Sequence, residues 1–431
     1  LEANPSTAQF WLSYIDALVK LDRLTDAKAV FDQAKVSGAK GEAFNKLEQR
    51  LEGVEPSEIT VSQNQDPPQD QLQPVIDLYS QRQLQKALDK ISQLLQKFPK
   101  SVTLYNIQGA ANAGLGQLDA AVMSYQQAIN IKPDYAKAHN NMGATLKDQG
   151  NLQKAITAYE KAIAIKPDYA EAYNNIGVVL KEQGKLEEAI GAYNKALAIK
   201  PDYAEAYNNI GVAVQNQGKM EEAIGAYNKA LAIKPDYAEA YNNLGVTVQK
   251  QGKLEEAIEA YNMALAVKPD YAKAYNNIGN ALKEQGKLEE AIEPFNKALA
   301  IKPDYADAYL NMGATLQEQG KMEEAIEAYN MALTIKPDYA EASLNLAFAF
   351  REKGEYEKAV MLFKKDNSSK SQTYLLKCLY NQDEQADFCD QLDYLINQGE
   401  NNAVIGSYIS RSQIRYGIKK ANPFCNDPLK Y

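Results

Sequence analysis

The amino-acid sequence predicts an all-α solenoid built from antiparallel helix pairs. The first observation is a period of thirty-four residues, marked by prolines at Pro99, Pro133, Pro167, Pro201, Pro235, Pro269, Pro303 and Pro337. The second is that each period holds two helical patterns separated by a glycine. A fixed period of this length indicates a stack of small modules. Such a stack presents a long repeated surface without a closed pocket, which favours binding over catalysis.

Residues 170–203 show what one repeat contains. A first helix is predicted over 170–183 from apolar residues at helical spacing, and Gly184 ends it because glycine readily adopts positive φ. A second helix is predicted over 187–199 in the same way. Pro201 cannot extend that helix. The apolar positions are Tyr173, Ile176 and Leu180 in the first helix and Ala189, Ile190, Tyr193, Ala196 and Leu197 in the second.

Small and large residues alternate where the two helices should meet. Gly177, Ala189 and Ala196 allow the helix axes to approach closely, and Leu186 and Tyr193 fill the space between them. One helix pair cannot bury its apolar stripe alone, so each repeat needs the next one.

Eight positions of the repeat carry a family resemblance. They are Tyr173, Ile176-Gly177, Gly184, Leu186, Ala189, Tyr193, Ala196 and Pro201. The pattern resembles the tetratricopeptide repeat (TPR). The resemblance implies a right-handed superhelical solenoid whose first helices line a concave groove.

The repeat register divides the chain into five parts. Residues 1–53 read as one repeat-like unit with a short helix, and 54–67 as a proline-containing linker. Residues 68–373 hold nine repeats, the last of them degenerate. Helical patterns remain over 372–380, 384–397 and 402–416, and residues 374–417 are expected to be a helical cap, since array ends need one. Residues 418–431 read as an irregular tail or a linker to a further domain.

Composition excludes several function classes. The net charge is −9, and no arginine lies between Arg82 and Arg351, so the basic stripe of a nucleic-acid groove is missing. The sequence contains no run of eighteen apolar residues, so it predicts no membrane-spanning helix. The single histidine, His139, occupies the place of Tyr173 and is expected to be a packing residue. We therefore expect no metal site, no cofactor and no catalytic residue in this chain.

The ends and the cysteines give two further expectations. The chain begins at Leu1 without a signal-like segment, so it should be part of a longer array. Cys378, Cys389 and Cys425 are an odd number without metal-site spacing, which favours reduced thiols and a cytoplasmic location.

Asparagine occupies the sixth place of seven consecutive repeats, at Asn141, Asn175, Asn209, Asn243, Asn277, Asn311 and Asn345. Asparagine costs up to roughly 0.7 kcal/mol in a helix relative to alanine, so its repetition asks for a reason. Its amide can pair with the C=O and N–H of an extended peptide backbone. From helix and strand spacings, the row would span about sixteen extended residues. The repeat arm of protein O-GlcNAc transferases carries a similar asparagine ladder that holds peptide backbone.

This asparagine ladder could also arise without any role in ligand binding. Duplication copies every residue, and the amides could only solvate the groove or join neighbouring helices. The fifth-position row, Asn140, Asn174, Asn208, Asn242 and Asn276, could be such copying. A clamp for terminal carboxylates is not expected, because the fifth place lacks lysine and the sixth lacks arginine from Ala136 onward. Side-chain selectivity should come from variable groove positions.

Three functions are compatible with the whole chain. The first is a non-catalytic scaffold that binds a protein or an extended peptide. The second is the recruiting arm of an enzyme, because residues 410–428 resemble the segment before a 2-oxoglutarate/iron oxygenase domain in some bacterial repeat proteins; glycosyltransferase and sulfotransferase fusions are known too. The third is self-association through the terminal repeats, which could form filaments. Pro294, inside a second helix, is either a tolerated surface change or the cause of a local bend of the array over 272–305.

Overall fold

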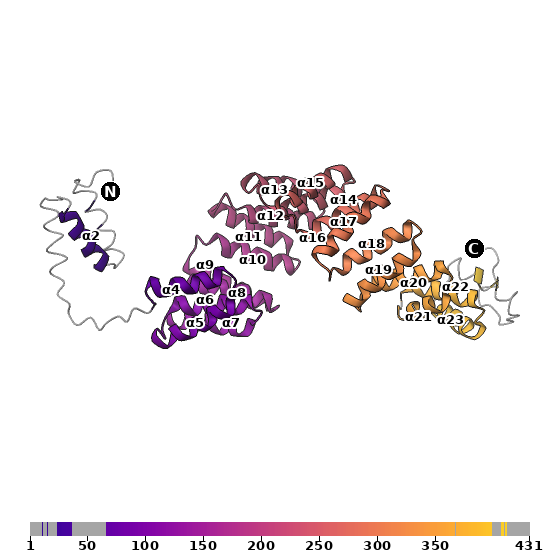
Figure 1. The fold of residues 1–431 in the computed structure, drawn as a ribbon, viewed down its shortest axis with the longest axis horizontal. Coiled ribbons are helices and arrows are strands. Elements are labelled where there is room, and N and C mark those ends of the chain that lie inside the picture. The colour runs from indigo at the N-terminus through magenta and orange to yellow at the C-terminus, as the bar shows by residue number, and fades with distance from the viewer. Residues whose placement is uncertain are drawn as a thin grey trace. The chain divides into compact units, whose positions relative to one another are not determined.

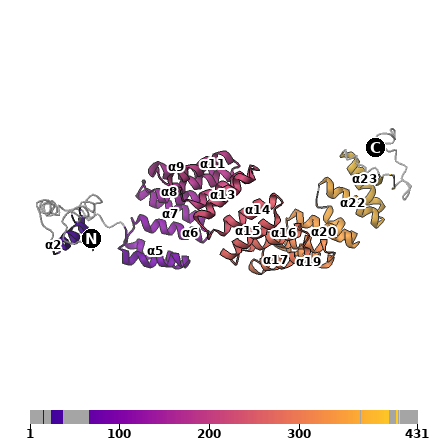
Figure 2. The same cartoon turned by 90° about the horizontal axis from the view of Figure 1, so that it is seen from above.

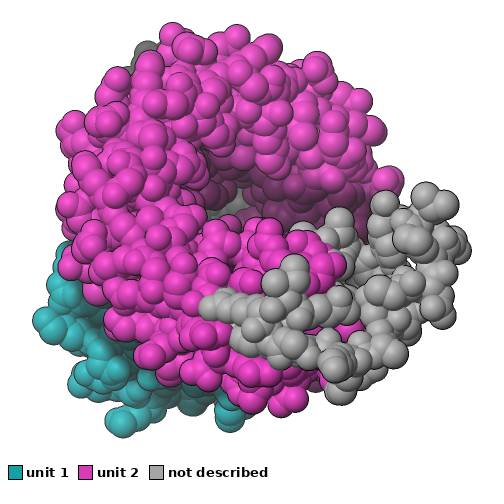
Figure 3. Space-filling model, turned by 90° about the vertical axis from the view of Figure 1, so that its right-hand side faces the viewer, with its two compact units in different colours: residues 1–142 teal, residues 143–431 magenta. Residues whose placement is uncertain are grey.

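The computed structural model describes residues 11, 15, 24–36, 66–366, 368–398, 407, 408, 410 and 411. All secondary structure in this part of the chain is helical (Figure 1). The chain divides into two compact units, unit 1 over residues 1–142 and unit 2 over residues 143–431 (Figure 3). The boundary falls inside one helix, α8, so each unit is considered by itself.

Unit 1 contains the first helix pairs. The side chains of Trp11 and Ile15 are buried, and α5 buries an apolar stripe that includes Ile91. Asp66, at the end of the predicted linker, accepts hydrogen bonds from the backbone N–H of Thr103 at 3.0 Å and from its hydroxyl at 2.9 Å. The helices are α2 (Leu24–Val36), α4 (Gln69–Ser80), α5 (Leu84–Lys97), α6 (Val102–Gly114), α7 (Leu118–Ile131) and the first half of α8 (Ala136–Asp148).

Unit 2 repeats one helix pair, and successive first helices begin thirty-four residues apart (Figures 1 and 2). Its first helices are α10 (Ala170–Glu182), α12 (Ala204–Asn216), α14 (Ala238–Lys250), α16 (Ala272–Glu284), α18 (Ala306–Glu318) and α20 (Ala340–Lys353). Its second helices are α9 (Leu152–Ile165), α11 (Leu186–Ile199), α13 (Met220–Ile233), α15 (Leu254–Val267), α17 (Leu288–Ile301), α19 (Met322–Ile335) and α21 (Tyr356–Phe363). The chain continues through α22 (Ser369–Gln382) and α23 (Gln385–Asn397). Each first helix packs on the following second helix, which confirms the predicted all-α solenoid of antiparallel pairs.

The turn and packing residues of the repeat have the roles that the sequence predicts. Gly184 has φ +76°, a value that side chains disfavour. Arg82 replaces this glycine in an early repeat and adopts φ +58°. A Cβ atom added to Gly177 would lie 2.4 Å from Cε1 of Tyr193, so the contact between the two helices requires glycine. Tyr193 itself is fully buried.

Pro294 does not interrupt its helix. Helix α17 runs through it without a break, and the next residue, Phe295, is fully buried like the tyrosine of sister repeats. The predicted bend of the array at this repeat stays a prediction.

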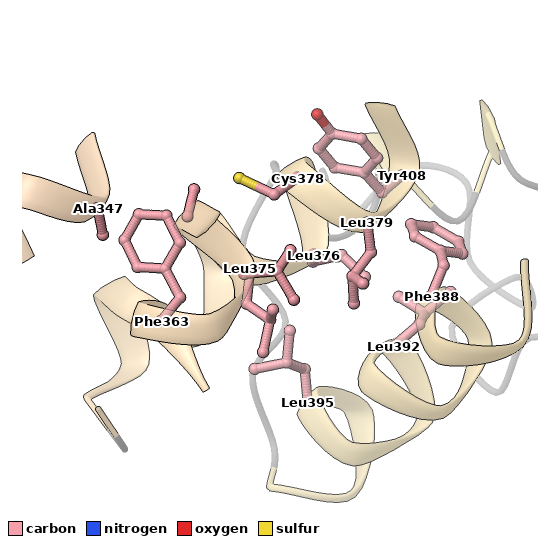
Figure 4. Packing of buried hydrophobic residues seen from close by; sticks show 12 residues of the cluster. Ala347, Phe363, Leu375, Leu376, Cys378, Leu379, Phe388, Leu392, Leu395 and Tyr408 are labelled. Atoms are coloured by element: carbon pink, nitrogen blue, oxygen red, sulfur yellow. The ribbon is translucent and has the colours of Figure 1, made fainter. Parts of the chain in front are cut away.

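The end of unit 2 departs from the period. Helix α21 has eight residues, whereas its counterparts have fourteen. The helices predicted over 372–380 and 384–397 are α22 and α23. They contribute to an apolar core in which the leucines of α22, among them Leu376, lie between Phe363 and Phe388 (Figure 4). Burial in this core raises the pKa of the Cys378 thiol to about 11.

Several predicted segments lie outside the described residues. They are the short helix over 42–53, most of the linker, most of the helix over 402–416 and the tail. The predicted domain boundaries stay predictions. Within the described residues, no helix combines the length and the apolar character that crossing a membrane requires.

Candidate functional site

The sixth-position asparagines occupy equivalent places on successive first helices. Asn141 belongs to unit 1, and the other six belong to unit 2. All seven are half-buried, whereas the fifth-position asparagines beside them are buried. Unit 2 curves around a hollow that is visible in Figure 3. The candidate site is the row of six asparagines from Asn175 to Asn345, because these six belong to one unit and recur at one position of its first helices.

The two asparagine rows are joined by hydrogen bonds between neighbouring repeats. Nδ2 of Asn209 donates to Oδ1 of Asn174 at 3.0 Å. The same contact, at 2.9 to 3.0 Å, links Asn243 to Asn208, Asn277 to Asn242, Asn311 to Asn276 and, in unit 1, Asn141 to Asn106. A bond between neighbouring helices, one of the alternatives left open by the sequence, is therefore present. The fifth-position row supplies its acceptors, a role that the repeated sequence did not reveal.

These bonds fix the amides of Asn209, Asn243, Asn277 and Asn311 in unit 2 and use only part of each amide. One N–H of Asn209 is engaged, and an amide has a second N–H and a carbonyl oxygen. The Oδ1 atoms of Asn209, Asn243, Asn277 and Asn311 accept no hydrogen bond from the described residues. From Asn209 to Asn311 the row thus presents one oriented amide, with acceptor and donor capacity left, at each repeat.

Asn345 is an exception at the end of the row. The fifth position one repeat earlier is Leu310, whose side chain is buried and cannot accept a hydrogen bond. The Asn345 side chain consequently has no hydrogen-bond partner among the described residues, although it is half-buried like its counterparts.

One position of the first helices varies while the asparagine row stays constant. It is the ninth residue, and it holds Val178, Val212, Val246, Asn280, Ala314 and Phe348. All six are half-buried. Because the exposed part of this row changes from aliphatic to polar to aromatic along the unit, it can distinguish ligand side chains.

The loops between repeats pair a lysine with a tyrosine. Lys200 lies 4.8 Å from the ring centre of Tyr203, and the pair recurs in the following repeats. Burial, followed by the nearby carboxylates of Glu171 and Glu205, raises the pKa of Tyr203 to about 12. The ring therefore stays protonated and serves as a surface for the lysine cation.

The described residues hold no cluster of histidine, cysteine and carboxylate side chains suited to a metal ion. His139 is buried, and its Nε2 lies 3.0 Å from the carbonyl oxygen of Pro133. This placement agrees with the expected packing role.

Comparison with known proteins decides the family. A TPR family described as the Cilia and flagella-associated protein 70 C-terminal domain matches residues 78–316, more than half of the chain. The chain belongs to this tetratricopeptide repeat family. The single-repeat family described as Tetratricopeptide repeat also matches this TPR chain, at residues 306–339.

Part of this TPR chain is similar to solved structures of other proteins. One is YrrB, described as a TPR protein with an unusual peptide-binding site, with 28% identity, a TM-score of 0.35, and coverage of 43% of this chain and 96% of YrrB. MamA has 28% identity, a TM-score of 0.34 and coverage of 38% and 96%. PilF of Pseudomonas aeruginosa has 20% identity, a TM-score of 0.43 and coverage of 48% and 94%. Comparison with curated protein sequences gives no match for the TPR chain.

Proposed function

We propose that this TPR chain is a non-catalytic interaction scaffold that binds extended segments of other proteins. The binding surface is the row of sixth-position asparagines in unit 2, from Asn175 to Asn345. Family membership supports the general role, because helical repeat arrays present long surfaces to protein partners.

The observation that carries this proposal is the way each asparagine is held. Asn209, Asn243 and Asn277 each donate one N–H to the preceding repeat, and their Oδ1 atoms accept no hydrogen bond from the described residues. A side chain that is already oriented loses less conformational entropy when it binds. An extended backbone needs a donor and an acceptor at regular intervals, and oriented amides provide both.

The test compares two triple variants. Asn209→Ala/Asn243→Ala/Asn277→Ala removes the amides that would meet the ligand. Asn174→Leu/Asn208→Leu/Asn242→Leu removes only their acceptors, and leucine is the residue that the chain itself uses at Leu310. Each variant is titrated with a peptide library, and its stability is followed by circular dichroism.

We expect the alanine variant to lose about tenfold or more in affinity across the library, because each lost hydrogen bond contributes about 0.5–1.5 kcal/mol. The leucine variant keeps the sixth-position amides. Its affinity should therefore fall only as far as these amides lose their orientation. Peptides with N-methylated backbones should bind poorly to the unaltered chain. Unchanged affinity of the alanine variant would refute the asparagine ladder and leave only inter-repeat bonding as its role.

The enzyme-arm and self-association hypotheses stay predictions, as does the cytoplasmic location. Mass measurement of the chain in solution tests self-association: a single monomeric species would eliminate it.

A further inference from the structure

The end of unit 2 gathers cations around two aromatic rings. Phe348 on α20 and Tyr374 on α22 meet edge to face, with their ring centres 4.7 Å apart. The residues around this pair form what we call the cationic aromatic patch. They are Asn345, Phe348, Arg351, Lys370, Tyr374 and Lys377.

Three positive groups share these two rings. The Arg351 guanidinium lies 5.4 Å from the ring centre of Phe348 and 4.7 Å from that of Tyr374. The Lys370 ammonium lies 5.3 Å from Phe348, and the Lys377 ammonium lies 4.4 Å from Tyr374. Stacking on a ring leaves the N–H groups of these cations free to bind an anion.

Few carboxylates balance this charge. Glu352 lies 3.8 Å from Arg351 and already accepts a hydrogen bond from Gln317 at 2.8 Å. Lys370 and Lys377 form no ion pair with any described residue. Three like charges close together repel one another, and an anion between them would relieve that repulsion.

The patch is accessible and continues the asparagine row. Lys370 is exposed, and Phe348, Arg351, Tyr374 and Lys377 are half-buried. Asn345 stands at the last sixth position, and its amide has no hydrogen-bond partner among the described residues, since Leu310 replaces the usual acceptor. The regular repeats carry no such group: their ninth positions are Val178, Val212, Val246, Asn280 and Ala314.

We infer that the cationic aromatic patch binds an acidic segment of the protein partner, with carboxylate side chains between Arg351, Lys370 and Lys377. The charge complementarity selects carboxylates, and the Asn345 amide meets the backbone beside them. The inference rests on the proposed function in that the ligand is a peptide. It also gives the bound peptide a direction, since the acidic part of the ligand lies at the C-terminal end of the asparagine row.

The test uses two peptides of about sixteen residues, acetylated and amidated, made of serine and alanine. One carries a central run of glutamates and the other carries glutamines instead. Calorimetric titration of the full chain should show the glutamate peptide binding about tenfold tighter or more, because hydrogen bonds to charged groups are the stronger ones. The preference should shrink as salt is added.

Two sets of variants locate the preference. Arg351→Gln/Lys370→Gln/Lys377→Gln should abolish it. Lys195→Gln/Lys229→Gln/Lys297→Gln removes equal charge and similar cation–ring contacts in the regular repeats, and it should keep the preference. If the first triple variant fails to fold, the single variants Lys370→Gln and Lys377→Gln should each reduce the preference several-fold.

The outcomes separate this inference from the proposed function. Equal binding of the two peptides, or equal losses in both triple variants, would overturn the patch. A glutamate preference that survives Asn209→Ala/Asn243→Ala/Asn277→Ala with unchanged affinity would uphold the patch and refute the ladder. Binding of both peptides that depends on the asparagines alone would do the reverse.

Discussion

The regular repeats of unit 2, residues 170–339, and its C-terminal segment, residues 340–398, build their cores differently. A regular repeat buries one tyrosine among small residues, as Tyr227 is buried with Ala223 and Ala230. The C-terminal segment instead assembles a continuous cluster that includes Phe363, Leu376 and Phe388 (Figure 4). In a regular array, each repeat presents the same surface to the next repeat. A terminal segment has no next neighbour on one side, and a larger apolar core can replace the lost contacts.

The largest effect is expected from Phe363→Ala. Phe363 is fully buried and stacks with Tyr374 at 6.1 Å between ring centres, so its truncation should cost about 3–5 kcal/mol. The loss should stay local, because each repeat contacts only its neighbours. Hydrogen exchange should accelerate in α20–α23 and remain unchanged in α10–α15.

Met361→Ala is the matched control for this variant. The Met361 side chain is 66% exposed and lies two residues away on the same helix, so its loss should hardly alter exchange. If Phe363→Ala accelerated exchange equally throughout unit 2, the two regions would form one cooperative core, and the comparison would break.

The second-largest effect is expected from the helix packing in the regular repeats. A Cβ atom at Gly211 would lie 2.5 Å from Cε1 of Tyr227, so Gly211→Ala should destabilise its repeat by about 1–3 kcal/mol. Gly225 lies in the next helix with open space around it, and Gly225→Ala should stabilise by about 0.5–1 kcal/mol through helix propensity. Urea denaturation of the two variants measures both changes. A cost at Gly225 similar to that at Gly211 would contradict a packing role for Gly211.

Much of the helix pairing in the regular repeats could be predicted from the sequence. The turn glycine and the proline set helices over 170–183 and 187–199, and the structure has α10 and α11 within one residue of these limits. The asparagine pairing could not be predicted, because near-identical repeats do not reveal which neighbouring positions touch. Leu310 and Leu344 break the fifth-position row, and these breaks are the signal that the sequence offers. The cationic aromatic patch lies where the period fades, so no repeat pattern pointed to Tyr374 or Lys377.

Alkaline pH should distinguish the two cores by their aromatic residues. Burial raises the pKa of Tyr193, Tyr227 and Tyr261 in the regular repeats. An unfolded tyrosine ionises near pH 10 while these folded ones stay protonated, so their stabilising contribution is complete below about pH 10 and declines above it. Each tyrosine should cost about 1.4 kcal/mol per pH unit in that window. In the C-terminal core Phe363 and Phe388 do not titrate, whereas Cys378 and Tyr408 do, and burial raises the pKa of both.

Urea denaturation at several pH values between about 8 and 11, a range that brackets the tyrosine pKa of about 10, measures this decline in the free energy of unfolding. Hydrogen exchange is too fast at these pH values, so proteolytic fragments of partly unfolded chains identify the region that opens. In a Cys378→Ala/Tyr408→Phe variant, which lacks these two groups, fragmentation that begins within α20–α23 as the pH passes the tyrosine range would break the comparison.

The smallest effect separates regular repeats that otherwise look alike. The hydroxyl of Tyr261 donates to Oε1 of Gln249 at 2.7 Å, and that of Tyr329 donates to Gln317 in the same way. Tyr193 has Lys181 at the corresponding place, and its buried hydroxyl has no partner among the described residues. Lysine recurs at this place twice: Lys147 is accompanied by Tyr159, and Lys283 by Phe295 in place of tyrosine.

Tyr261→Phe should therefore cost about 1 kcal/mol, because it leaves Gln249 without its donor. Tyr193→Phe should be neutral or stabilising, since it removes a buried hydroxyl that makes no hydrogen bond. Urea denaturation of the two variants provides the measurement, and exchange of residue pairs offers a control: Gln249→Lys should remove most of the penalty of Tyr261→Phe. Equal costs for the two phenylalanine variants would show that the hydroxyls contribute alike, and that the lysine and phenylalanine of the 272–305 repeat are not a compensated pair.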